Sequence, residues 1–181
     1  MKMRLTILSA AVLLAACQGG SLTVREVTGK NKFTRLEGAS IVLNQELRVR
    51  AGNARVFVQD GQVGGGFNSY RPHCAFEIDS VQHDGFPIQA DTFLISRVQG
   101  SIQQVVSTEP TRLAALHLAR GGMDGGSSSL YEGYHFWLSS ENQPDVRRMS
   151  CFGVYAQPYE LYPPTLEEIR QALGPIAEVR Q

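Results

Sequence analysis

Apolar and polar residues alternate along most of the chain after Leu22, with the period of two that half-buried β-strands show. In the segment 74–79, for example, Cys74, Phe76 and Ile78 share one face, and the residues between them share the other. The segments that carry a strand pattern most clearly are 46–50, 55–59, 74–79, 91–98, 102–107, 130–138 and 149–155. The pattern therefore predicts a mainly β domain.

Turn-forming residues are expected to separate these strands. Asp84-Gly85 lies between two short runs, 81–83 and 86–88, and both of its residues tolerate positive φ, so we predict a hairpin there. Gly100 is expected to turn one strand back into the next. Longer glycine-rich loops are predicted at 61–66 and 121–129.

The segment 111–120 is ambiguous. Its preceding proline, its alanines and leucines and the glycine after it suit a helix, whereas the alternation of Ala114, Leu116 and Leu118 suits a strand. We favour a hairpin with the strand at 130–138, and the helix stays an open alternative.

A short helix is predicted near the C-terminus, at about residues 165–173. Thr165 and Glu168 have the spacing of a capping box, and Gly174-Pro175 marks the end of the helix. Its apolar face would be formed by Leu166, Ile169 and Leu173. Together with the strands, this predicts a single antiparallel β-sandwich or barrel-like domain at 22–181, closed by the helix.

The first sixteen residues have the organisation of a secretory signal peptide. Lys2 and Arg4 make a positive start, and a twelve-residue apolar stretch, 5–16, follows with only two polar interruptions. At 1.5 Å per residue, this stretch is too short to cross a hydrocarbon core of roughly 30 Å. We therefore expect residues 1–16 to be removed.

The end of this leader, Leu14-Ala15-Ala16-Cys17, resembles the lipobox of bacterial lipoproteins. The resemblance implies that Cys17 is acylated and becomes the first residue, with 17–21 as the lipidated N-terminus and tether. Two or more acyl chains would anchor it stably in a membrane. Gln18 follows the cysteine where the best-known sorting rule has Asp for inner-membrane retention, so the outer membrane is expected.

Composition and charge narrow the classes of partner. Removal of the leader leaves 15 basic residues against 17 acidic ones, a net charge of −2. A near-neutral domain without a basic cluster in its sequence argues against nucleic-acid binding. The expected partners are a membrane, through the lipid, and another envelope protein.

Cys74 and Cys151 are expected to form a disulfide, because two cysteines in an exported domain most often pair in an oxidising compartment. The alternative is a metal site that also uses His73 and His83. Their spacing does not match a recurring zinc arrangement, so neither a metal nor a cofactor is predicted.

No catalytic motif is present. The glycine-rich run 61–66 lacks the ending of a phosphate loop, and the serines at 127–129 lack the spacing of a nucleophile elbow. His135 and Trp137 are expected on one face of a packed strand. Aromatic residues of the proline-bearing segment before the helix, Tyr155, Tyr159 and Tyr162, are candidates for partner contact, although a strap packed over the core explains them as well.

These features favour a non-enzymatic lipoprotein that works by contact with another envelope component. One alternative is a carrier of a small apolar ligand, with a pocket lined by Phe93, Tyr134, Phe136 and Trp137. The other alternative is an envelope hydrolase, which would require His135 or His73 to meet a serine and a carboxylate in the fold.

Overall fold

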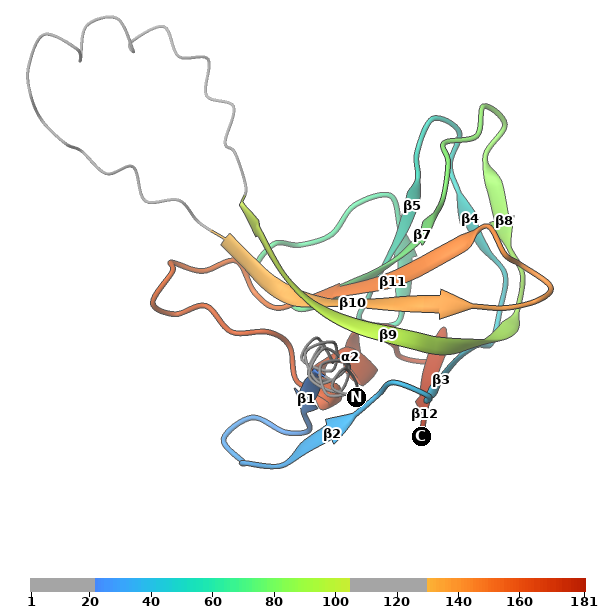
Figure 1. Cartoon of the computed structure of the whole chain (residues 1–181). Coiled ribbons are helices and arrows are strands. Elements are labelled where there is room, and N and C mark those ends of the chain that lie inside the picture. The colour runs from blue at the N-terminus through green and yellow to red at the C-terminus, as the bar shows by residue number, and fades with distance from the viewer. Residues whose placement is uncertain (1–21, 105–129) are drawn as a thin grey trace, which may run out of the picture.

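The domain is built on one curled antiparallel sheet, shown in the computed structural model, which describes residues 22–104 and 130–181 (Figure 1). Its eight strands lie in the order β12-β3-β9-β10-β11-β7-β5-β6 and form a half-barrel. In chain order they are β3 (Ser40–Leu43), β5 (Arg55–Gln59), β6 (Gln62–Gly64), β7 (His73–Ile78), β9 (Asp91–Gln104), β10 (Leu130–Ser139), β11 (Val146–Phe152) and β12 (Ala177–Arg180). The prediction of a mainly β, barrel-like fold is confirmed.

Two short two-stranded sheets flank the half-barrel. One pairs β1 (Thr23–Arg25) with β2 (Phe33–Arg35), and the other pairs β4 (Leu47–Val49) with β8 (Phe86–Ile88). The β4–β8 pair lies beside β5 in Figure 1, so it widens the sheet region near the strand that carries Arg55.

The C-terminal helix α2 (Leu166–Leu173) spans the opening of the half-barrel. It contacts β12 at one end of the sheet order and β5 and β7 toward the other. Its capping box forms as the sequence predicts, because the Thr165 side chain accepts from the Glu168 N–H and the Glu168 carboxylate accepts from the Thr165 N–H. Four apolar helix residues are buried: Leu166, Ile169, Ala172 and Leu173.

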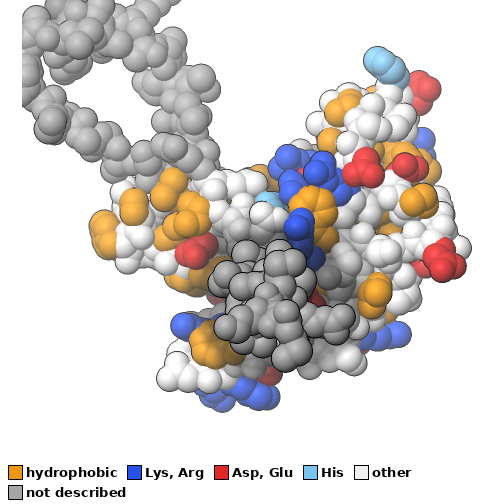
Figure 2. All heavy atoms as spheres, in the orientation of Figure 1, with side chains coloured by type: hydrophobic (Ala, Val, Ile, Leu, Met, Phe, Trp, Pro, Cys, Tyr) orange, Lys and Arg blue, Asp and Glu red, His pale blue; other side chains and the backbone are white. Residues whose placement is uncertain are grey.

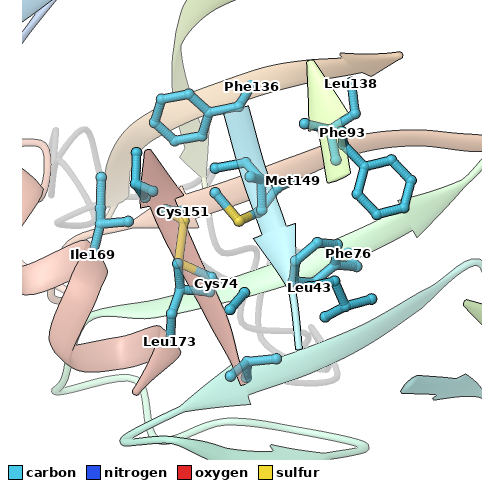
Figure 3. Close-up of a cluster of buried hydrophobic side chains, with 14 of the residues drawn as sticks. Leu43, Cys74, Phe76, Phe93, Phe136, Leu138, Met149, Cys151, Ile169 and Leu173 are labelled. Atoms are coloured by element: carbon cyan, nitrogen blue, oxygen red, sulfur yellow. A yellow bond between two sulfur atoms is a disulfide. The ribbon is translucent and has the colours of Figure 1, made fainter. Parts of the chain in front are cut away.

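The core fills the space between the helix and the inner face of the sheet (Figure 3). Cys74 and Cys151 lie directly opposite each other on β7 and β11 and form the expected disulfide, with Cα atoms 4.1 Å apart. Both cysteines are fully buried. Large side chains around them include Leu43, Phe76, Phe93, Phe136, Met149, Ile169 and Leu173. The disulfide therefore ties two neighbouring strands beneath the helix.

The hairpin predicted at Asp84-Gly85 is wrong. β8 pairs with β4, with Leu47 opposite Ile88, and residues 81–83 are not a strand. The physical reason is burial: Leu47 and Ile88 together reach the core, whereas Val81 is more than half exposed. Gly85 does adopt a positive φ of 78°, but within a loop.

Two further turn predictions need correction. Gly100 does not end a strand, because β9 continues through it and Gly100 pairs with Tyr134 in the long ladder to β10. The run 61–66 is not only a loop. Asp60 and Gly61, with φ values of 53° and 70°, form a tight turn between β5 and β6. Gly100 stays in the strand because it has a partner on β10, and the run 61–66 contains a strand because the turn takes only two residues.

Several sequence-based predictions concern residues outside the described ranges. They are the leader 1–16, acylation of Cys17, the tether 17–21, the segment 111–120 and the loop 121–129. In the described part, β10 is paired with β9 on one side and with β11 on the other. Among the described residues, no helix has the length and apolar character needed to span a membrane.

Candidate functional site

A row of charged and aromatic side chains crosses the outer face of the sheet, opposite the core. Strand register places Arg55 on β5 next to Glu77 on β7, then Arg148 on β11, Trp137 on β10 and Arg97 on β9. We call these five residues the outer-face row. They come from five segments of the chain, so only the fold brings them together.

Two β-bulges shape the row around Trp137. In β11, Val146 pairs with Ile78 and Arg148 with Glu77, so Arg147 is an extra residue. In β9 the same irregularity opposite β10 leaves Ser96 as the extra residue, and its hydroxyl donates to the Trp137 carbonyl at 3.2 Å. Bulges re-aim side chains. Here the bulge in β11 brings both consecutive arginines to the indole.

Trp137 is half-buried among three guanidinium groups. The guanidinium carbons of Arg97, Arg147 and Arg148 lie 4.5, 5.1 and 5.4 Å from an indole ring centroid, within cation–π range. The indole Nε1 donates to Gln99 Oε1 at 3.1 Å. Figure 2 shows basic side chains gathered around an apolar group on this face. The result is a positively charged aromatic surface.

A chain of buried hydrogen bonds lies beside this surface on the same face of the sheet. Arg148 donates from Nε and Nη2 to Glu77 Oε2, at 3.0 and 2.9 Å. The Ser150 hydroxyl lies 2.6 Å from Glu77 Oε1 and 2.7 Å from His135 Nδ1. His135, Ser150 and Glu77 are all buried, and a fully connected buried network of this kind holds its members in one geometry.

The direction of each proton in the chain follows from chemistry. An ionised carboxylate only accepts, so Ser150 must donate its single proton to Glu77. The Ser150 oxygen must then accept from His135, which fixes the proton of the neutral imidazole on Nδ1. His135 is therefore a donor to Ser150 and does not act as its base.

The pKa values agree with this assignment. Burial alone would raise the pKa of Glu77, but hydrogen bonds from Ser150 and Arg148 overcome that effect and hold the pKa below its ordinary value. Burial and the charge of Arg148 lower the pKa of His135, with Glu77 opposing. At neutral pH the network therefore contains an ionised Glu77 and a neutral His135.

This arrangement brings together a histidine, a serine and a carboxylate, but in an order that does not activate the serine. In a hydrolytic triad the histidine accepts the serine proton and the carboxylate orients the histidine. Here the serine lies between the other two and is buried. The cavity beside Ser150 has a volume of about 40 Å³, far below the ~300–1,000 Å³ of ordinary ligand pockets.

An aromatic cluster adjoins the polar network on the same face. His73 stacks on Phe67 with ring centroids 3.7 Å apart, and Tyr131 and Phe152 lie around them. Burial lowers the pKa of His73 to about 4, and its Nδ1 has no hydrogen-bond partner among the described residues. His73 is therefore neutral at physiological pH and packs as an aromatic ring.

The side chain of Gln59 on β5 makes several hydrogen bonds to the loop that carries Phe67. Its amide nitrogen lies 3.0–3.2 Å from the carbonyls of Asn68, Arg71 and Pro72, and its amide oxygen accepts from the Asn68 N–H at 2.8 Å. Because the side chain serves both as donor and as acceptor, it fixes the path of the loop over the sheet.

The three tyrosines proposed for partner contact have different surroundings. Tyr155 packs its ring against Tyr70 and Tyr131, and its N–H donates to the Ser69 carbonyl at 2.9 Å. Tyr162 lines a cavity of about 300 Å³ together with Phe33 and Tyr134 of other elements. Tyr159 is 83% exposed at the outside of the segment. The segment is thus partly a strap with one projecting tyrosine.

The residues proposed to line a carrier pocket do not lie on one surface. Phe93, Tyr134 and Phe136 are buried in the core, whereas Trp137 lies on the opposite face of β10. Alternation along a strand places neighbours on opposite faces, so Phe136 and Trp137 cannot share a pocket. Of the four residues, Phe93 and Phe136 pack in the core, and Tyr134 also lines the cavity that it shares with Tyr162.

No group of three or more metal-ligating side chains gathers in the described ranges 22–104 and 130–181. Comparison of the chain with protein-family models, with curated proteins and with solved structures finds no match.

Sequence reasoning missed most of the outer face. The shared face of His135 and Trp137 was predictable from spacing, but the partners Glu77, Arg148 and Ser150 come from strands whose order the sequence did not reveal. The double arginine 147–148 and the three arginines within 48–55 were the local signals that could have indicated a basic surface.

Proposed function

We propose that this chain is a lipid-anchored cell-envelope protein whose β domain acts as a non-enzymatic binding module. The observation that carries the proposal is Trp137 on the outer face, framed by the guanidinium groups of Arg97, Arg147 and Arg148. The partner that fits the proposal is another envelope protein.

The chemistry of this surface supports recognition by contact. Tryptophan and arginine are the residues most enriched where binding energy concentrates in protein interfaces. Arg148 is held by Glu77, and Trp137 is held by Gln99, so little side-chain freedom remains to be lost on binding. A partner with acidic and aromatic side chains would complement the surface.

The first eighteen residues support the proposed location in the outer membrane. Leu14-Ala15-Ala16-Cys17 resembles a lipobox, and Gln18 favours the outer membrane. The Cys74–Cys151 disulfide suits an oxidising compartment such as the periplasm. A domain tethered in this way would remain close to partners in the same membrane.

Site-specific crosslinking in cells tests the binding surface. A photo-reactive residue at Gln99, beside Trp137, is expected to capture one envelope protein repeatedly, and Trp137→Ala is expected to abolish the capture. The same residue at Tyr159 tests the projecting tyrosine, and at Arg180 on strand β12 it serves as the control. Equal yields at all three positions, or capture unaffected by Trp137→Ala, would rule out this surface.

Cell fractionation tests the anchor. Cys17→Ser is expected to release the protein from the membrane pellet into the soluble periplasmic fraction. If the variant pellets with membranes as tightly as the parent, the lipid anchor is wrong, and the crosslinking result still stands or falls on its own.

The envelope hydrolase remains the second candidate, because His135, Ser150 and Glu77 do meet in the fold. Their hydrogen-bond order argues against it. A fluorophosphonate probe, which labels activated serines, decides the matter: we expect no labelling of Ser150, and labelling that Ser150→Ala removes would establish the hydrolase instead.

A further inference from the structure

An open cleft of about 630 Å³ lies beside the outer-face row, between β4, the start of β5 and the end of β6. Three arginines line it: Arg48 on β4, Arg50 just after that strand, and Arg55 at the start of β5. We call it the arginine cleft. Arg55 also belongs to the outer-face row, so the two features are continuous.

The lining of the cleft has three arginines and one acidic residue, which leaves an excess of positive charge. Asp84 is the one acidic residue among the lining residues, and Arg48, Arg50 and Arg55 make no ion pair within 4.0 Å in the described ranges. Arginines elsewhere in the described ranges do form ion pairs with carboxylates, as Arg71 does with Asp60 at 2.7 Å. Glu77, the carboxylate nearest Arg55 in the row, is already engaged by Arg148.

A glycine positions one of these arginines. A Cβ atom added to Gly65 would lie 2.6 Å from Arg50 Nη1 and 3.0 Å from its guanidinium carbon. The guanidinium therefore rests directly on the Gly65 backbone, at the wall of the cleft. Any side chain at position 65 would have to push Arg50 away.

We propose that the arginine cleft binds a phosphate group. Each guanidinium offers five N–H donors in a planar fork. Three guanidinium groups together offer more donors than the two oxygens of one carboxylate can accept. A phosphate group offers more acceptor oxygens and a larger charge, which three guanidiniums match better. The cleft is larger than a phosphate alone, and apolar Val63 in its lining leaves room for the group that carries the phosphate.

Phosphate binding in the arginine cleft requires neither the lipid anchor nor a protein partner. The phosphate could belong to a soluble phosphorylated molecule or to the headgroup of a phospholipid. Two probes separate these sources: inorganic pyrophosphate for the soluble one, and phosphatidylglycerol vesicles, compared with phosphatidylcholine vesicles, for the lipid.

The test uses the full chain purified in a non-ionic detergent, with calorimetric titration of pyrophosphate and co-sedimentation with vesicles after detergent removal. The cleft variant is Arg48→Gln with Arg50→Gln. The matched control is Arg35→Gln with Arg170→Gln, which removes the same charge from exposed positions outside the cleft. We expect the cleft variant to lose at least tenfold in affinity and the control to lose less than twofold.

The two titrations distinguish a soluble ligand, a lipid headgroup and the absence of a phosphate site. Pyrophosphate binding that only the cleft variant loses supports a soluble ligand, and vesicle binding with the same dependence supports a lipid headgroup. Binding of neither probe, or equal losses in the cleft variant and the control, overturns the proposal. If the cleft variant does not fold, Gly65→Ala replaces it, because it displaces Arg50 without changing the net charge, and the same two outcomes apply.

Discussion

Arg148 and Glu77 lie opposite each other on neighbouring strands, and two nitrogens of the Arg148 guanidinium donate to a single oxygen of Glu77. The other Glu77 oxygen accepts from Ser150. Only 19% of the Arg148 side chain and 8% of the Glu77 side chain are exposed. The pair therefore joins the buried hydrogen-bond chain to the arginines around Trp137.

The consecutive arginines of β11 offer a matched test of this pair. Arg148→Gln leaves a mostly buried carboxylate without its counter-charge, and we expect it to lower the free energy of unfolding by about 2 kcal/mol. Arg147 lies 3.8 Å from Asp79 with both side chains about half exposed, so Arg147→Gln should change stability by less than about 0.5 kcal/mol. Urea denaturation followed by Trp137 fluorescence measures both, and equal effects would contradict the role given to Glu77.

Acid should destabilise the domain well above the ordinary carboxylate range. The folded-state pKa of His73 is about 4 against an unfolded value of 6.5, so its contribution is present above pH 6.5 and is lost as the pH falls to 4. The loss amounts to about 3 kcal/mol. The lowered pKa of His135 acts in the same direction, and that of Glu77 adds a further loss at lower pH.

His73→Phe isolates the histidine contribution. The ring stacking on Phe67 can be kept while the titrating group is removed, so the free energy of unfolding should fall less steeply from pH 6.5 to 4 in the variant than in the parent. Urea denaturation at several pH values in this window gives the two slopes. Identical slopes would show that His73 does not carry the dependence.

The hydrogen bonds from Gln59 to the loop 65–72 should stabilise the aromatic cluster of His73 and Phe67. Gln59→Leu keeps most of the side-chain volume but removes the contacts to the carbonyls of Asn68, Arg71 and Pro72 and to the Asn68 N–H. We expect a loss of about 1–2 kcal/mol in the free energy of unfolding. Faster amide hydrogen exchange in residues 65–72 should accompany it. Unchanged exchange there would mean that Phe67 packing, the Arg71–Asp60 ion pair and the Tyr155–Ser69 hydrogen bond hold the loop without Gln59.

Local patterns predicted the longer strands and the helix, because alternation and capping are encoded within a few residues, but they did not predict the short strands β1, β2, β3 and β12. The face shared by Cys74, Phe76 and Ile78 and the capping box of Thr165 are examples. Turns were harder. Two Asp-Gly pairs lie in the described ranges, and the hairpin forms at Asp60-Gly61 rather than at Asp84-Gly85, since only the former lies between segments that pair with each other.

The candidate site was mostly beyond sequence reasoning, because its residues meet only through the strand order. Arg48, Arg50 and Arg55 of the cleft lie within eight residues of the sequence, but only the fold aligns Arg55 with Arg148 and Arg97 across the sheet. Predicting this would have required knowing that β7 lies between β5 and β11. Nothing within any one segment encodes that order.

The turn at Asp60-Gly61 docks on the end of helix α2, which yields another comparison. Gly61 has a φ of 70°, its N–H donates to the Ala172 carbonyl at 3.0 Å, and an added Cβ would lie 2.8 Å from Pro175. Gly52 has a similar φ of 75° with open space around it. Gly52→Ala should cost about 1 kcal/mol for the left-handed backbone alone, and Gly61→Ala about 2–3 kcal/mol because the clash adds to it. Equal shifts in the denaturation midpoint would show that the turn does not rest on the helix end.

The disulfide should be the largest single covalent contribution to stability. It closes a loop between residues 77 positions apart, and the chain-entropy model gives about 4–5 kcal/mol for such a loop. We expect reduction by dithiothreitol, or the double substitution Cys74→Ala and Cys151→Ala, to lower the free energy of unfolding by about that amount. The double variant should not respond to dithiothreitol, which controls for effects of the reductant elsewhere. A loss below about 1 kcal/mol would mean that the domain is nearly as stable without the disulfide as with it. The disulfide would then no longer support an envelope location.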